Sequence, residues 1–215
     1  MNKRGKLIVE AMTDRLRENM KNNEGPNDAV GRKRTLKELG VKRIVDKMLS
    51  NYKNIALIHL IFPEAVILHT MRDPMDTLFS CYTNKFDDDN AMWAHDMTSL
   101  VTEYVIYLEI MQHFRNELPR GRIVDVSYES LIASPERVMR EIVTSRHVLG
   151  LSWDPMVMRY TESNRTVHAS YVRRSTYPSG GWRKYAKELE PLIRELSSHI
   201  PRLRAINAWP EIYSN

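Results

Sequence analysis

The 215-residue sequence contains one cysteine, Cys81, and only eight glycines. A single cysteine excludes an internal disulfide, so an oxidising compartment is neither required nor excluded. The seven histidines are scattered and have neither the spacing nor the cysteine partners of a metal site, so we expect no metal. We interpret Cys81 itself as a buried apolar residue.

Long apolar runs are also missing. The most apolar stretch, residues 55–71, is interrupted by two histidines, a proline and a glutamate. A membrane helix needs about 20 mostly apolar residues, so we interpret this stretch as protein core. The basic residues 1–6 have no apolar stretch behind them and make a poor secretory signal, and the compartment stays open.

Positively charged residues are in small excess, with 32 Lys and Arg against 27 Asp and Glu and a net charge of +5. Nucleic-acid binders cluster basic residues with aromatic platforms, whereas here the excess is spread along the chain and its runs at 32–34 and 173–174 are short. Nucleic-acid binding would need such clusters, so we expect no nucleic-acid partner. The charge is a weak indication of an anionic ligand.

Strand-like and helix-like segments alternate along the chain. Apolar runs predict short strands, and amphipathic or capped runs predict helices. The strands are predicted at residues 41–45, 65–68 and 123–126, and the helices at 7–21, 35–40, 51–61, 73–86, 94–117, 134–150 and 182–199. This alternation predicts an α/β domain with a mainly parallel sheet flanked by helices. Ligands bind such sheets at the carboxyl ends of the strands.

Some segments carry further expectations. Residues 65–68 do not alternate, which is typical of a strand covered on both faces. Residues 51–61 are expected to be mostly buried. Residues 94–117 form the clearest helix, because their apolar side chains fall on one stripe. Residues 153–177 show no regular pattern.

The residues directly after the predicted strands are the candidates for a site. Asp73 can cap the helix that follows Arg72, and Pro74 suits its first position. Ser80 lies two turns beyond Asp73 on the same face. A guanidinium and a hydroxyl beside a helix N-terminus predict an anion pocket, since both donate hydrogen bonds to phosphate oxygens. In the alternative, Arg72 pairs with Asp73 or Asp76 and Ser80 only packs. The other strand ends carry Asp46-Lys47 and Ser127-Tyr128-Glu129.

Several ordered motifs resemble the sulfotransferase superfamily. The run from Phe62 to Leu68, followed by Arg72–Thr77 and Ser80–Tyr82, resembles the 3′-phosphate signature of that family. It is closest to the branch of the protein-tyrosine sulfotransferases and the bacterial enzymes with tetratricopeptide repeats. One family-like segment, Val45–Asn51, precedes it, and in this segment Leu49 replaces the usual Pro. Three others follow it: Val126–Leu131, Leu149–Pro155 and Val167–Tyr185. The resemblance implies a P-loop-NTPase-like sulfotransferase fold.

The resemblance implies binding residues for the co-substrate, 3′-phosphoadenosine-5′-phosphosulfate (PAPS). Arg72 and Ser80 match the residues that bind its 3′-phosphate, and Tyr128 matches the tyrosine that packs on its adenine. Arg173 and Arg183 are candidates for further phosphate contacts. In the alternative, Tyr128 is a half-buried aromatic residue at the sheet end, and Arg173 and Arg183 are solvated surface charges.

The resemblance also implies catalytic residues. Charge builds on the leaving phosphate during sulfonate transfer, so cations and hydroxyl donors there lower the barrier. Lys47 resembles the family lysine that neutralises this charge, and Ser170 resembles the serine that contacts the sulfonate or bridging oxygen. A solvated lysine and a turn-forming serine are the alternatives.

The function implied is PAPS-dependent transfer of a sulfonate to an acceptor hydroxyl on a peptide, with protein tyrosine as one candidate, or on a small molecule. The alternative is a catalytically inactive protein that binds PAPS or its desulfonated product (PAP). The resemblance also allows a homodimer.

The family's Gly-rich loop for the 5′-phosphosulfate, and the catalytic Glu after it, have no match in this sequence. We therefore expect an N-terminally incomplete version of a longer enzyme. A weak but intact nucleotide binder, or an unrelated N-terminal source of donors, would also explain the missing loop. The predicted domain organisation is a helical extension at 1–43, a nucleotide-binding domain at 44–200 and a tail at 201–215.

Overall fold

The computed structural model describes residue 43 and residues 45–84, 89–162 and 179–210. The helices predicted at 7–21 and 35–40 lie outside these residues. The chain divides into two compact units between Ala65 and Val66.

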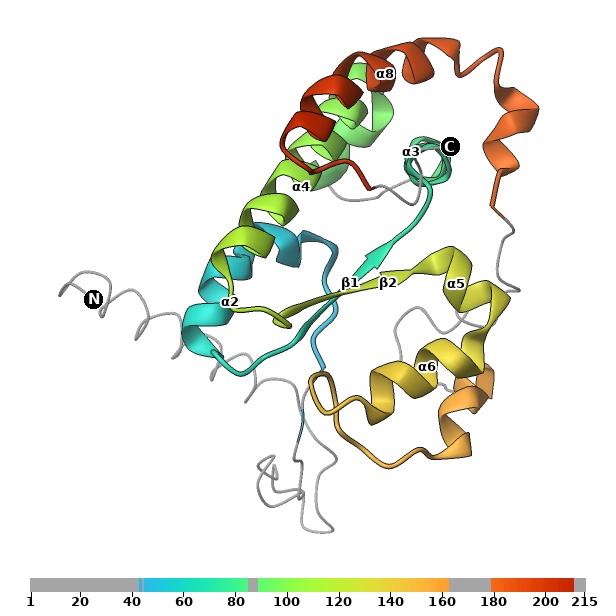
Figure 1. Ribbon diagram of the computed structural model, residues 1–215. Coiled ribbons are helices and arrows are strands. Elements are labelled where there is room, and N and C mark those ends of the chain that lie inside the picture. Colours follow the sequence, from blue (N-terminus) through green and yellow to red (C-terminus); the bar gives the residue numbers. More distant parts are fainter. Residues whose placement is uncertain (1–42, 44, 85–88, 163–178, 211–215) are drawn as a thin grey trace, which may run out of the picture. The chain divides into compact units, whose positions relative to one another are not determined.

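The described part of the first unit is helical. A 3₁₀ helix, η1 (Leu49–Asn54), runs into α2 (Ile55–Ile61), which confirms the predicted helix (Figure 1). The expectation that it is mostly buried is wrong, because Ile55 is the one buried side chain among the described residues of this unit. The reason is length: α2 has only about two turns to pack. Of the strand predicted at 41–45, residues 41, 42 and 44 lie outside the described residues; residues 43 and 45 are in no strand, and Val45 is 89% exposed.

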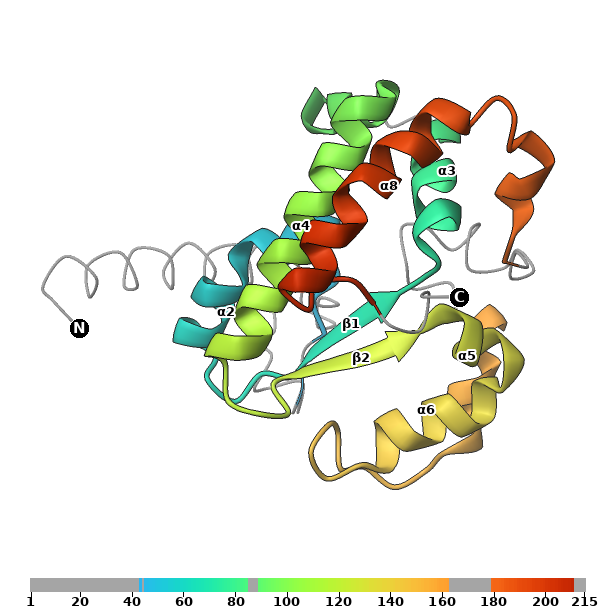
Figure 2. The ribbon, with the colours of Figure 1, turned by 45° about the horizontal axis from the view of Figure 1, so that its top comes forward.

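In the second unit, two strands form a parallel pair (Figures 1 and 2). They are β1 (Ile67–Met71) and β2 (Ile123–Ser127), with Met71 directly opposite Ser127. Both strands and their parallel direction are confirmed. The sheet of the described residues is nevertheless smaller than expected, with two strands among many helices. Leu68 is 43% exposed, so β1 is not covered on both faces as expected.

The helix after β1 begins as its sequence predicts. α3 (Pro74–Thr83) has Pro74 at its first position, and the Asp73 carboxylate accepts a hydrogen bond of 2.9 Å from the Asp76 backbone N–H. Such a cap satisfies one of the N–H groups that a helix start leaves unpaired. The helix ends at Thr83, earlier than the predicted residue 86.

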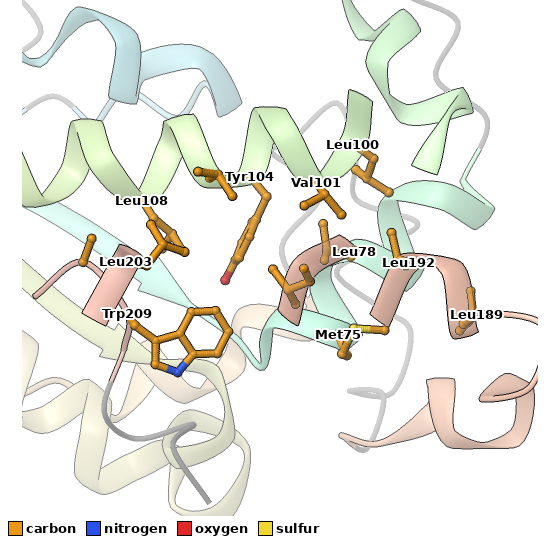
Figure 3. Close-up of a cluster of buried hydrophobic side chains, with 13 residues drawn as sticks. Met75, Leu78, Leu100, Val101, Tyr104, Leu108, Leu189, Leu192, Leu203 and Trp209 are labelled. Atoms are coloured by element: carbon orange, nitrogen blue, oxygen red, sulfur yellow. The ribbon is translucent and has the colours of Figure 1, made fainter. Parts of the chain in front are cut away.

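The main core lies between α3, α4 (Met97–Glu117) and α8 (Glu190–Ala205). The predicted apolar stripe of α4 is confirmed, and Figure 3 shows its side chains pointing toward those of α3 and α8. The helix predicted at 182–199 is divided: a 3₁₀ helix, η4 (Gly181–Tyr185), is separate from α8. Pro191 explains the division, because it has no N–H to continue a helix from the preceding turn.

Further helices surround these elements. η2 (Asp89–His95) precedes α4, and α5 (Tyr128–Ala133), which the sequence did not predict, directly follows β2. α6 (Pro135–Thr144) is confirmed but ends before the predicted Gly150. η3 (Pro155–Glu162) is a 3₁₀ helix within the stretch expected to be irregular.

Candidate functional site

The carboxyl ends of β1 and β2 bring two predicted site residues together. Because Met71 and Ser127 are register partners, the residues that follow them, Arg72 and Tyr128, leave the sheet at the same level. The guanidinium carbon of Arg72 lies 4.9 Å from the centroid of the Tyr128 ring. A cation over an aromatic face is attracted by the ring's negative potential, which holds the arginine at the sheet end.

Arg72 also approaches a buried carboxylate on α3. Its Nη2 lies 4.0 Å from Oδ1 of Asp76, whose side chain is 2% exposed while that of Arg72 is 24% exposed. The Nε of Arg72 is buried and has no hydrogen-bond partner among the described residues. The alternative pairing of Arg72 with Asp76 is therefore seen at long range, and it leaves part of the guanidinium's donor capacity unused.

Glu129 joins three segments at this end of the sheet. Its Oε1 accepts hydrogen bonds from the Asp73 backbone N–H at 2.9 Å and from the Ser179 hydroxyl at 3.1 Å. Its Oε2 accepts one from the Ser127 hydroxyl at 3.1 Å. Ser127 in turn caps α5 by accepting the Ser130 backbone N–H. The sequence placed Glu129 at a strand end, but it gave no reason to assign it these partners.

A pocket of about 330 Å³ opens beside these residues. Its lining mixes carboxylates and hydroxyls with one guanidinium, and consists of Asp73, Asp76, Ser127, Glu129, Ser130, Ser179 and Arg183. Arg183 is the one predicted site residue in this lining, and its guanidinium carbon lies 4.9 Å from the Trp182 ring centroid. Arg72 is not part of this lining, but its guanidinium approaches one of the lining residues, Asp76.

Ser80 lies one turn beyond Asp76 on α3, since residues four apart are neighbours on a helix surface. Its hydroxyl accepts a hydrogen bond of 3.2 Å from the Asn84 side chain. Ser80 does not line the pocket, and among the described residues no hydrogen bond joins it to Arg72. Joint binding of a phosphate by Arg72 and Ser80 therefore stays a prediction.

The other predicted residues lie elsewhere in the chain. Lys47 is exposed and belongs to the first unit, where the neighbouring Asp46 carboxylate accepts a hydrogen bond of 2.7 Å from Asn51. Ser170 and Arg173 lie outside the described residues. The catalytic roles of Lys47 and Ser170 stay predictions.

A second polar cluster joins the two strands to α4. Nδ1 of His69 lies 2.6 Å from Oδ1 of Asp125, its register partner, and Nε2 of His69 contacts the Tyr107 hydroxyl. Arg115 donates to the same Asp125 oxygen at 2.6 Å. Burial alone would raise the pKa of Asp125, but the hydrogen bonds from His69 and Arg115 and the charge of Arg115 outweigh it and lower this pKa to about 2.

Comparison with known proteins shows the family of this chain. Residues 10–155, about two thirds of the chain, match the model of the sulfotransferase family. The chain belongs to the sulfotransferase family. The match to this family includes Lys47, Arg72, Ser80 and Tyr128, and it ends before Ser170, Arg173 and Arg183.

A curated relative of this sulfotransferase-family chain occurs in Aquifex aeolicus (strain VF5), where it is named only as an uncharacterized protein. The two are 31% identical over 168 residues, which make up 75% of this chain and 22% of the relative. The chain thus spans little more than a fifth of the relative's length.

Two other kinds of feature are absent from the described part of this sulfotransferase-family chain. Within it, no helix has the length and apolarity needed to cross a membrane. Nor do three His, Cys, Asp or Glu side chains gather there in a way that could hold a metal ion.

Proposed function

We propose that this chain binds PAPS and transfers its sulfonate to an acceptor hydroxyl. The observation that carries the proposal is the pair of Arg72 and Tyr128 at the carboxyl ends of two parallel strands. That edge is where parallel sheets bind ligands. Membership of the sulfotransferase family supplies the chemistry.

The nucleotide's 3′-phosphate fits Arg72 best. The guanidinium is partly exposed, stands beside the N-terminus of α3 and has a donor without a partner among the described residues. Guanidinium donors and a helix N-terminus both favour an anion. Ser80, one turn further along α3 than Asp76, would add a hydroxyl after a change of its rotamer. Tyr128 would pack on the adenine.

The reaction exchanges one bond for another. The acceptor oxygen bonds to sulfur and loses its proton, while the bond from sulfur to the bridging phosphate oxygen breaks and PAP leaves with the electron pair. Negative charge grows on that phosphate, so the cation of Lys47 and the hydroxyl of Ser170 would lower the barrier there. Arg183 at the pocket and Arg173 would hold further phosphate oxygens.

A protein tyrosine is the acceptor that the resemblance to the protein-tyrosine branch favours, and a small-molecule hydroxyl is the other candidate. The same resemblance allows a homodimer. A second function, nucleotide binding without turnover, is favoured by one observation: the sequence has no Gly-rich run of the kind that holds the 5′-phosphosulfate in the family.

Calorimetric titration with PAP, and with adenosine 5′-phosphate, which lacks the 3′-phosphate, tests the nucleotide site. We expect PAP to bind more tightly, and Arg72→Ala to weaken PAP binding by about 10-fold to 100-fold, the usual effect of losing a charged hydrogen bond. Arg140→Ala is the matched control, because its guanidinium also lies over an aromatic ring, that of Trp153 at 4.4 Å. Equal affinity for the two nucleotides would contradict the proposal.

Transfer of labelled sulfonate from PAPS to an acidic peptide containing tyrosine then separates the two functions. Transfer that is lost in Arg72→Ala and kept in Arg140→Ala supports the enzyme. PAP binding that responds to the same substitutions, without any transfer to peptide or small-molecule hydroxyls, supports the binding protein.

A further inference from the structure

The backbone of residues 179–183 is tied to the sheet end by two carboxylates from different elements. Oδ2 of Asp76, on α3, accepts the Gly180 backbone N–H at 2.6 Å. Oε1 of Glu129, on α5, accepts the Ser179 hydroxyl at 3.1 Å. Ionised acceptors make hydrogen bonds roughly twice as strong as neutral ones, so two such bonds hold this segment firmly.

A turn connects the anchored residues, Ser179 and Gly180, to Arg183. The Arg183 backbone N–H donates to the Gly180 carbonyl at 3.1 Å, which closes a tight turn. Gly180 has a φ of +91°, a conformation that side chains other than glycine's rarely adopt, and a Cβ there would collide with the Arg183 guanidinium. Arg183 therefore lies close against the anchored residue, with little freedom between them.

Two aromatic contacts fix the far side of this turn. Trp182 is partly buried against the main core, and its ring lies under the Arg183 guanidinium. Tyr185 stacks on Phe79 of α3, with ring centroids 5.3 Å apart. The side chain of Arg183 itself is exposed and lines the pocket. An exposed arginine on a backbone held from both sides is a preorganised donor, whose ordering costs little when an anion binds.

We propose that Asp76 and Glu129 are positioning residues for Arg183: by binding Gly180 and Ser179 they hold its guanidinium at the pocket, ready for a phosphate of the nucleotide. The two carboxylates line the same pocket as Arg183 and accept hydrogen bonds from backbone and hydroxyl donors, while Oδ1 of Asp76 also lies 4.0 Å from Arg72. This inference rests on the proposed function for the identity of the anion. The anchoring itself does not depend on it.

A double-mutant cycle tests whether the anchors act through Arg183. Single substitutions Ser179→Ala and Arg183→Ala are each expected to weaken PAP binding, the first by about threefold to tenfold, the usual effect of one hydrogen bond. In the Arg183→Ala background, Ser179→Ala should have no further effect, because its target has been removed. If Ser179 supported the pocket only structurally, the two losses would multiply.

A conservative variant keeps the test independent of misfolding. In Glu129→Gln the neutral amide oxygen can still accept from Asp73 and Ser179, though more weakly than a carboxylate, so the loss of PAP affinity should be smaller than in Glu129→Ala. In Glu129→Ala the loss should be at least that of Ser179→Ala. Ser197→Ala is the matched control, since its hydroxyl bonds the Ile193 carbonyl on α8, and it should leave PAP affinity unchanged.

Hydrogen exchange of residues 179–185, measured without nucleotide, separates this inference from the proposed function. Faster exchange there in Ser179→Ala and Glu129→Ala, with a smaller increase in Glu129→Gln, supports the anchors even if the wild-type protein binds no PAP, in which case only the proposed ligand falls. Unchanged exchange in both alanine variants, or multiplying losses of affinity in the cycle, would overturn the inference.

Discussion

Asp125 shows how one side chain can hold several elements together. It sits opposite His69 in the strand register, and Arg115 reaches it from α4. An ionised carboxylate is needed to accept from both partners, and they in turn keep its pKa near 2 against the opposing effect of burial. The charge of this residue therefore contributes to the attachment of α4 to the sheet.

The lowered pKa of Asp125 predicts a loss of stability in acid. The contribution should be fully present above the unfolded-state pKa of about 4 and disappear as the pH falls through about 2. The stability difference between wild type and Asp125→Asn, measured by urea unfolding, should therefore shrink between pH 5 and pH 2.5.

A ¹³C titration of the Asp125 carboxyl group gives the direct measurement. Arg115→Met removes a hydrogen bond and a positive charge, so it should raise the observed pKa. A wild-type carboxyl that titrates near pH 4 would show that the cluster is not formed in solution.

At the scale of elements, the packing of α8 on α4 and α3 carries most of the burial in the second unit. Leu192 and Leu203 of α8 are completely buried, and so is Val101 of α4 (Figure 3). Leu100 of α4 is almost completely buried. η4, which bears Arg183, leads into α8 through residues 186–189. α8 is therefore joined by a short stretch of chain to the segment that carries Arg183.

Leu192→Ala should destabilise the protein by about 2–5 kcal/mol, because it leaves a cavity where the side chain is fully enclosed. Ile206→Ala, just after the same helix, removes a side chain that is 44% exposed and should change stability far less. Urea unfolding would measure both, with the midpoint shifted and the m-value unchanged. Similar losses for the two variants would contradict the packing described.

Local sequence signals predicted the start of some elements, but they could not predict contacts between segments far apart in the chain. Asp73 and Pro74 mark the start of α3 because a cap and a first-turn proline act within four residues. The partners of Glu129 come from segments far away in the chain, so no local pattern could reveal them. Ser80 does not line the pocket although it lies on the same helix as Asp76, because spacing along one helix does not reveal which other segments complete a pocket.

At the scale of the whole chain, the described parts of the two units differ in the number of side chains that they bury. The described part of the first unit has one buried side chain, Ile55, whereas α4 alone has six. Local opening of a protein requires less free energy where fewer apolar contacts are lost.

Native-state hydrogen exchange should therefore be faster in α2 than in α4, by on the order of 10-fold or more. The amides of α8 serve as the internal comparison, and they should exchange at rates close to those of α4, since both helices pack into one core. Equal protection of α2 and α4 would mean that the chain opens as one cooperative body.

The register of the two strands has a practical consequence for protein engineering. The spacing of Arg72 and Tyr128 depends on five paired positions between β1 and β2, whereas the turn that enters β2 is exposed at Gly121, whose φ of +84° favours glycine. Foreign peptide segments could be inserted beside Gly121, with that glycine kept, while the pairing that holds Arg72 next to Tyr128 stays as it is.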